Sequence, residues 1–286
     1  MLQQYSGYAR LMRLHRPVGI WLLLWPTLWA LWIAGQGQPR EKLLVVFILG
    51  TIVMRSAGCI INDFADRNFD AHVKRTSDRP LVTGEVALKE AFFVFAGLLC
   101  IALGLVLMLN RLTQVLAVIG VAITIIYPFS KRFISTPQFI LGIAFAWGVP
   151  MAFAAQLGGV PRIGWLLFVG AIIWGIIYDT EYAMADREED LKIGVKSIAT
   201  LFGDLDKILL WALQAMFFGT LTLVGQSEDL GSWYFGGLGV AVLLALYQQY
   251  LLKDRDSERC FRAFLNNAVL GACIFIGIAL DYLFRN

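Results

Sequence analysis

Two clusters of carboxylate side chains are the residues of this 286-residue chain best suited to chemistry. The first cluster lies in NDFADRNFD at residues 62–70. In a helix, Asn62, Asp66 and Asp70 would share one face, because residues four apart lie above one another. Like charges at this spacing repel unless a cation lies between them. Carboxylate and amide oxygens suit a hard divalent cation, so the spacing predicts a metal site, with Asp63 beside it.

The second cluster lies in YDTEYAMADREED at residues 178–190, where Asp186 and Asp190 are again four apart. Each of these aspartates follows its counterpart, Asp66 or Asp70, by 120 residues. A common offset of this kind indicates an internal duplication. We therefore expect one domain over residues 1–286, built from two repeat halves and a last helix, at about 18–132, 138–255 and 264–284.

Basic residues are interleaved with both clusters. Mg²⁺ typically keeps several waters and binds through one or two carboxylates plus substrate phosphates, which predicts a phosphorylated substrate. Arginine and lysine side chains donate to the phosphate oxygens that a metal leaves free. For each basic residue, a role in membrane topology is an equally good explanation. The residues that follow the clusters are Arg67, Lys74, Arg75, Arg79, Lys192 and Lys196.

The composition of the chain is that of a membrane protein. It is 58% hydrophobic and 16% charged, with a mean hydropathy of +0.68, whereas soluble domains are about 25% charged. A net charge of +3 gives no argument for nucleic-acid binding. We expect an all-α polytopic membrane protein with nine transmembrane helices in a bundle. The predicted spans are residues 18–35, 43–61, 91–109, 112–128, 138–156, 164–182, 208–225, 233–252 and 264–284.

The basic residues are distributed unequally between the two sides of the membrane. Of the 24 Lys and Arg residues, 18 lie in the N-terminal tail and in the loops predicted at 62–90, 129–137, 183–207 and 253–263. The positive-inside rule places these segments, with both carboxylate clusters, in the cytoplasm. The C-terminus is then expected on the opposite side.

Arg55 is a charged residue inside an otherwise apolar predicted span, seven residues before Asn62. Burying it at the centre of a membrane helix costs roughly 2.5 kcal/mol or more, so a functional role facing the bundle interior is one explanation. The other explanation is that its long side chain reaches up to the cytoplasmic interface.

Several stretches of the sequence resemble one family. GCIINDFADRNFD, the following HVKRTSDRPL, and YDTEYAMADREED are similar to the two signature loops of the UbiA superfamily of intramembrane aromatic prenyltransferases. More narrowly, they resemble the 4-hydroxybenzoate polyprenyltransferases of ubiquinone biosynthesis. The similarity covers nearly the full length, including MRLHRPVGIWLLLWPTLWALW near the N-terminus and YPFSKR at 127–132.

The resemblance implies a helical bundle in the cell inner membrane, with a central cavity and a lateral opening to lipid. It also implies two Mg²⁺ ions that clamp a polyprenyl diphosphate of octaprenyl or similar length. The long all-trans polyprenyl group would be transferred to the 3-position of 4-hydroxybenzoate, with release of diphosphate. In this mechanism the allylic C–O bond ionises, the ring carbon ortho to the phenol attacks the cation, and loss of the ring proton restores aromaticity.

The resemblance further assigns roles to individual residues. The metal ligands would be Asn62, Asp63, Asp66, Asp70, Asp186 and Asp190, with Asn62 also near the substrate. The diphosphate contacts would be Arg67, Lys74, Arg79 and Lys131. Arg132 would be the first candidate for the acceptor carboxylate and Arg55 the second. Asp179 would orient the second site or deprotonate the phenol.

Other readings of the same sequence make different predictions. Haem O synthases and the menaquinone-type and chlorophyll-type prenyltransferases share the metal motifs but take other acceptors, and YDTEYAMADREED favours 4-hydroxybenzoate. A secondary transporter would keep its charged residues near the bilayer midplane. A structural scaffold explains the hydropathy but not the carboxylate spacing. Glu189 is an alternative ligand, although a helix places Asp186 and Asp190 together and Glu188 away from them.

Overall fold

The computed structural model describes residues 2–70, 76–130, 133–134, 136–194 and 196–285. Over these ranges all regular secondary structure is helical, which confirms the predicted all-α class. The α-helices are α1 (Leu2–Leu11), α2 (Val18–Ala34), α3 (Glu41–Asp70), α4 (Pro80–Thr83), α5 (Leu88–Leu107), α6 (Arg111–Ser130), α7 (Pro137–Ala146), α8 (Gly148–Leu157), α9 (Arg162–Ile193), α10 (Ile198–Phe202), α11 (Asp206–Ser227), α12 (Ser232–Leu251) and α13 (Ser257–Phe284). Two 3₁₀ turns, η1 (Gly203–Leu205) and η2 (Leu252–Asp254), lie beside α11 and α12.

Within these ranges, eight helical segments are long and apolar enough to cross a membrane. One of them, Pro137–Leu157, consists of α7 and α8, which are separated at Trp147. The helix α2 has 17 residues and is a shorter ninth apolar helix. The chain is therefore a multi-span membrane protein, as its composition predicts. The duplication that relates the two halves stays a prediction.

The loops predicted at 62–90 and 183–207 are in part helical, because α3 and α9 continue through the carboxylate motifs. No glycine or proline follows Gly58 in α3 or Gly175 in α9, so nothing in the sequence interrupts the backbone hydrogen bonding. The helix α9 ends where Gly194 adopts a left-handed conformation, with φ +72°. The loop prediction is wrong over these stretches, since hydropathy reports where the membrane ends and not where the helix ends.

The helix α9 is packed against α7, α11 and α13. Because lipid is as apolar as a protein core, membrane helices are held together by close backbone approach and buried polar contacts. A Cβ on Gly175 would lie 2.7 Å from the Cα of Gly142, so α7 and α9 meet at their backbones. Asn267 of α13 donates to Glu181 of α9 at 2.7 Å and accepts from Trp174 at 2.9 Å. These contacts fix the helix that carries the second motif.

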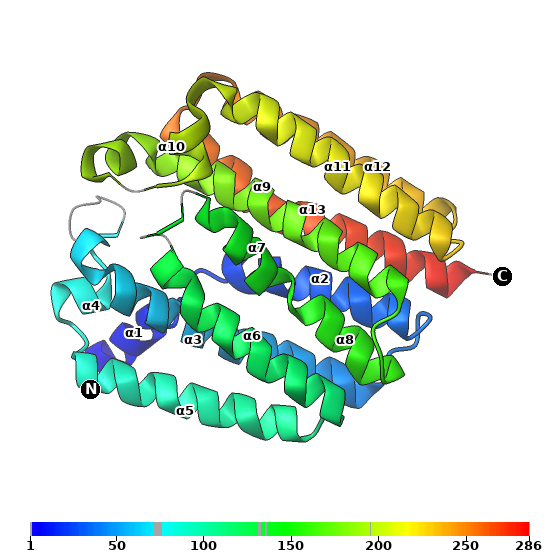
Figure 1. Cartoon of the computed structure of the whole chain (residues 1–286), viewed down its shortest axis with the longest axis horizontal. Helices are drawn as coiled ribbons and strands as arrows, with labels where there is room; N and C mark the ends of the chain where they lie inside the picture. Colours follow the sequence, from blue (N-terminus) through cyan, green and yellow to red (C-terminus); the bar gives the residue numbers. More distant parts are fainter. Residues whose placement is uncertain (1, 71–75, 131–132, 135, 195, 286) are drawn as a thin grey trace.

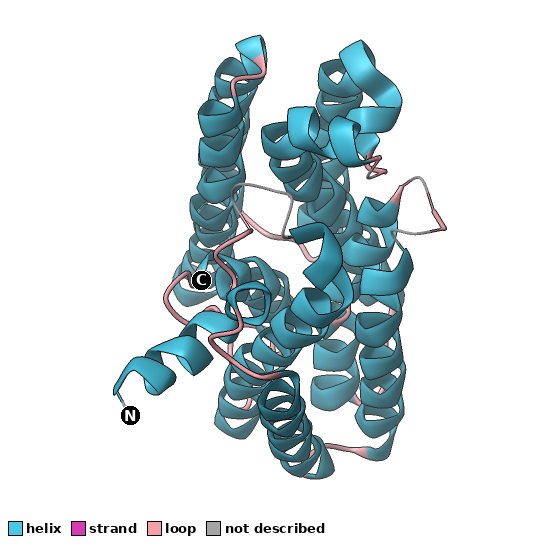
Figure 2. Ribbon diagram, turned by 90° about the vertical axis from the view of Figure 1, so that its left-hand side faces the viewer, coloured by secondary structure: helices cyan, strands magenta, loops and turns pink. Residues whose placement is uncertain are grey.

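Three of the short helices gather at one end of the bundle (Figure 1). There, α1, α4 and α10 lie beside the ends of α3 and α9 that carry the two motifs, while the C-terminus lies at the opposite end. In the view onto this end, the described residues form helices and loops only (Figure 2). Leu11 of α1 is fully buried against Ile60 and Leu81, so the N-terminal helix is packed onto α3 and α4.

Candidate active site

A cavity of about 1030 Å³ lies inside the helical bundle, as predicted. Much of its wall is apolar, and the helices α2, α3, α5, α6, α7, α8 and α9 all contribute to it. Apolar lining residues include Leu22, Phe47, Met54, Leu99, Phe145 and Met151. We use the term cavity mouth for one polar part of the lining, which consists of Arg13, Asn62, Asp63, Asp66, Arg79, Asp186 and Asp190.

The cavity brings the two carboxylate motifs together. Asn62 and Asp66 reach it from α3, and Asp186 and Asp190 reach it from α9. In each helix the two residues are four apart, and this spacing puts both on the face toward the cavity. Asp179 lines the same cavity, two turns before Asp186. The shared faces are as predicted, and the role of these residues as metal ligands stays a prediction.

The two glutamates of the second motif lie away from this lining. Glu188 is exposed and Glu189 is partly buried, and among the described residues neither contributes to the cavity wall. The helical spacing that favours Asp186 and Asp190 over the glutamates therefore agrees with the structure.

Four of the predicted groups lie outside the described part of the structure: the side chains of Asp70, Lys74, Lys131 and Arg132. Of the other predicted diphosphate contacts, Arg79 lines the cavity, whereas Arg67 is not among the described lining residues. Lys196, which the sequence offers only as a basic residue after the second motif, does line it. The basic side of the described site is therefore Arg79 and Lys196 together with arginines from other segments.

Arg55 lines the cavity, which favours a role facing the bundle interior over a side chain that reaches up to the cytoplasmic interface. Its guanidinium carbon lies 5.4 Å from the centre of the Phe145 ring, a cation–π distance. It also lies against Gly19 of α2, where a Cβ would overlap with the guanidinium. Arg55 is thus held between an aromatic ring and a helix backbone inside the bundle.

A basic segment just before α2 also reaches the cavity. Arg10, Arg13, His15 and Arg16 all line it, although the sequence suggests only a topological role for arginines at this position. The signal that could have found them is weak, because clusters of arginine before a first span are common in membrane proteins. Their proximity to the motifs depends on the fold of α1 across the end of α3.

Asp63 forms ion pairs with two arginines of this region through one carboxylate oxygen. Its Oδ1 lies 2.5 Å from Nη2 of Arg13 and 3.1 Å from Nη1 of Arg79. The Asp63 side chain is only 1% exposed, and its Oδ2 is buried with no hydrogen-bond partner among the described residues. A carboxylate that the sequence groups with the metal ligands is therefore surrounded by cations and protein atoms.

Two titratable groups of the N-terminal segment have shifted pKa values. Burial is the largest single influence on the pKa of Arg13 and lowers it, but the charge and hydrogen bond of Asp63, together with smaller contributions from Cys59 and Tyr182, raise the pKa overall. Partial burial, followed by the charge of Arg16, lowers the pKa of His15 below its usual value near 6.5. Arg13 is therefore a permanent cation at the cavity mouth, and His15 is mostly neutral at pH 7.

The sequence profile of one family, the UbiA prenyltransferase family, matches residues 23–274 of the chain. The chain belongs to this family. A UbiA-family relative from Nitrosococcus oceani, named 4-hydroxybenzoate octaprenyltransferase, is 57% identical over 99% of this chain and 99% of its own length. A match of this extent includes both carboxylate motifs.

Two solved UbiA-family structures have the same fold. The apo structure of a UbiA homologue from Aeropyrum pernix K1 superposes with a TM-score of 0.78 and 23% identity, over 91% of this chain and 97% of that one. A UbiA homologue from Archaeoglobus fulgidus bound to GPP and Mg²⁺ has a TM-score of 0.76 and 18% identity, over 97% of this chain and 99% of that one. At these identities the likeness concerns the fold.

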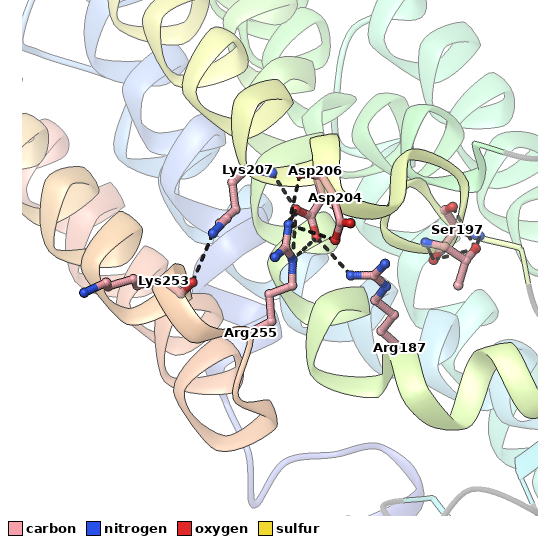
Figure 3. Close-up of polar contacts among 8 residues, drawn as sticks. Arg187, Ser197, Asp204, Asp206, Lys207, Lys253 and Arg255 are labelled. Carbon is pink, nitrogen blue, oxygen red and sulfur yellow. Dashed lines mark hydrogen bonds and ion pairs between the residues drawn. The ribbon is translucent and has the colours of Figure 1, made fainter.

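This UbiA-family chain has a second buried carboxylate that is bound by two arginines (Figure 3). Asp206, at the start of α11, is fully buried and accepts from Arg255 through Nη2 at 2.8 Å and Nε at 3.1 Å. Arg187, next to Asp186 in α9, lies 3.6 Å from the same carboxylate. These hydrogen bonds to Asp206 raise the pKa of Arg255. Asp206 thereby connects the end of α9 to α11 and to the turn after α12.

Proposed function

We propose that this chain transfers a long all-trans polyprenyl group from polyprenyl diphosphate to the 3-position of 4-hydroxybenzoate in ubiquinone biosynthesis. The observation that carries the proposal is the cavity in which acidic motifs from α3 and α9 meet next to an apolar wall. The near-full-length identity to a relative named 4-hydroxybenzoate octaprenyltransferase supports this acceptor among those that the family uses. A donor of octaprenyl or similar length fits that name.

The donor set at the cavity mouth fits Mg²⁺. Asn62, Asp66, Asp186 and Asp190 offer oxygen ligands, which this ion prefers. The described residues contain no cluster of three His, Cys, Asp or Glu side chains that could hold a metal alone. Mg²⁺ does not need one, because it binds through one or two carboxylates plus substrate phosphates. We assign these four residues and Asp70 as the ligands; when bound, the ion supplies Lewis-acid polarisation and offsets leaving-group charge.

The basic residues of the site bind the diphosphate. Arg79 and Lys196 line the cavity beside the acidic motifs, so they contact phosphate oxygens as the allylic C–O bond lengthens and charge accumulates on the leaving group. Arg67, Lys74 and Lys131 keep the same proposed role. The apolar wall holds the polyprenyl chain and excludes water from the allylic cation.

Arg55 binds the carboxylate of the acceptor. It is a cation fixed inside the bundle, and 4-hydroxybenzoate is an aromatic acid whose charge needs a partner there. Phe145 beside it offers a ring surface for the acceptor. Asp179 accepts the phenol or ring proton. Arg132, the first candidate from the sequence, lies outside the described residues and stays a proposed contact for the same carboxylate.

The distribution of basic residues supports a location in the cell inner membrane, with the N-terminus and both acidic motifs on the cytoplasmic side. The C-terminus then lies on the opposite side, at the end of the bundle away from the motifs. In this orientation the soluble acceptor enters from the cytoplasm, while the donor stays in the bilayer by its tail.

Membranes that overexpress the chain are expected to convert 4-hydroxybenzoate and polyprenyl diphosphate to 3-polyprenyl-4-hydroxybenzoate. Mass spectrometry of the lipid extract measures the product, with Mg²⁺ and with EDTA in parallel. We expect product with Mg²⁺ and its loss with EDTA, restored when Mg²⁺ is added in excess. Product from another aromatic acceptor, and none from 4-hydroxybenzoate, would overturn the choice of acceptor. Transfer that persists in EDTA would overturn the metal assignment.

Gly19→Ala is expected to impair use of the acceptor. The added methyl group displaces the Arg55 guanidinium, and misplacing a binding group by about 1 Å costs up to roughly 100-fold. We expect kcat/KM for 4-hydroxybenzoate to fall by roughly 10- to 100-fold, with little change in KM for the donor. Gly97→Ala in α5 is the matched control, because nothing lies within 4 Å of a Cβ at that position. Equal effects of the two variants would contradict the role of Arg55.

A further inference from the structure

Asp63 joins two arginines that come from separate parts of the chain. Arg13 lies in the turn after α1, and Arg79 is the residue that precedes α4. Both guanidinium groups lie within 3.1 Å of the same oxygen, and all three residues line the cavity. One carboxylate between two guanidinium groups leaves a net positive charge. The three groups line the same cavity as the acidic motifs.

The turn that carries Arg13 is held in place by further contacts. Arg10 donates to Glu85 at 2.8 Å and to the carbonyl of Asp78 at 2.6 Å, and Leu11 is buried against α3 and α4. Arg13 itself has φ +56°, a left-handed conformation that is unfavourable in a residue with a Cβ. Such a conformation persists only where the surroundings impose it. The ion pair with Asp63 and the anchoring by Arg10 provide that constraint.

The same geometry disfavours Asp63 as a metal ligand. Its Oδ1 already lies beside two cationic donors, and the side chain is only 1% exposed, so Asp63 presents almost no surface to an ion in the cavity. Asn62 and Asp66, its neighbours on α3, lie on the cavity face of the helix. Asp63 lines the cavity as well, so its two arginine contacts, and not its place on the helix, distinguish it from Asn62 and Asp66.

We propose that Asp63 is a positioning residue, which holds Arg13 and Arg79 together at the cavity mouth to receive the diphosphate and does not ligate the metal. A guanidinium presents five N–H donors in a planar fork, and one carboxylate oxygen cannot accept them all. Two guanidinium groups fixed on one anchor present donors to phosphate oxygens without first being ordered by the substrate. This inference rests on the proposed function, and it adds Arg13 to the diphosphate contacts.

The test is Asp63→Asn in the full-length protein, which keeps the shape of the side chain but removes its charge. We expect KM for polyprenyl diphosphate to rise at least tenfold, kcat to change less than threefold, and the Mg²⁺ concentration for half-maximal activity to change less than twofold. Arg13→Gln should raise the same KM. The loss of donor-binding free energy in the double variant should not exceed the sum of the losses in the two single variants. An increased Mg²⁺ requirement with an unchanged KM for the donor would overturn the proposal.

The matched control is Asp206→Asn, which removes the charge of the other buried carboxylate with two arginines, outside the described cavity lining. It is expected to lower stability without raising KM for the donor. A second readout needs no turnover: inorganic diphosphate should raise the melting temperature of the wild type and of Asp206→Asn, but not of Asp63→Asn. Equal stabilisation of all three would also overturn the proposal. If diphosphate stabilises the wild type but the wild type makes no product, the proposed function is wrong, whereas the role of Asp63 in diphosphate binding stands.

Discussion

Asp66→Ala and Asp186→Ala are each expected to abolish prenyl transfer in a protein that still folds. The two residues line the same cavity from α3 and α9, one in each motif, and we propose both as ligands of the ion that polarises the diphosphate. Charge stabilisation by a bound metal is worth several kcal/mol in a transition state. Loss of about 4 kcal/mol corresponds to roughly a thousandfold in rate. The product of single turnovers, measured by mass spectrometry, should fall by at least that factor.

Glu188→Ala is the matched control for these variants. It removes a carboxylate of the same motif whose side chain is exposed and directed away from the described cavity lining. We expect it to keep most of the wild-type activity. The melting temperatures of the aspartate variants should stay near that of the wild type or rise, because one of several like charges is removed. If Glu188→Ala lost activity and Asp186→Ala kept it, the metal ligands would lie on the other face of α9, and our assignment would be wrong.

Asp206→Ala is expected to cause the largest loss of stability of any single change considered. The carboxylate is fully buried and accepts hydrogen bonds from both Nη2 and Nε of Arg255, with Arg187 close by (Figure 3). Removing one partner of a buried ion pair costs about 3–5 kcal/mol, because the remaining charges lose their compensation. The free energy of unfolding, measured by denaturant titration in detergent, should fall by about this amount.

Asp204→Ala is the control for this second prediction. Asp204 lies 3.6 Å from the same Arg255, but its side chain is 93% exposed. Exposed ion pairs contribute about 0–1 kcal/mol, so the free energy of unfolding should hardly change. If both variants lose the same stability, the buried Asp206 contacts are not what holds α9, α11 and the turn after α12 together.

Much of the fold and part of the site follow from local patterns in the sequence. The spacing of Asn62 and Asp66, and that of Asp186 and Asp190, depends only on helical geometry, so the shared faces could be predicted. The apolar segments could be counted because a membrane span needs a long apolar run. The break between α7 and α8 could not, since it lies inside one such run.

The arginine contacts of Asp63 depend on tertiary structure. Arg13 and Asp63 are 50 residues apart, and nothing in the spacing of either residue indicates the other. An arginine before a first span is explained by topology alone, and an aspartate beside two others is explained by a shared metal. In both cases the local explanation accounts for the residue by itself, so nothing in the sequence points to the contact between the two. The link of Asp206 to Arg187 and Arg255 was missed for the same reason.

The anchored N-terminal turn makes the two ends of the chain unequal as attachment points. Arg10, Arg13 and Arg16 belong to the wall of the cavity, so a fluorescent protein or affinity tag fused close to α1 is carried next to the cavity mouth. The last helix, α13, ends at the far side of the bundle (Figure 1). A reporter joined after Phe284 is therefore remote from the chemistry, and immobilisation through that end leaves the cavity mouth free.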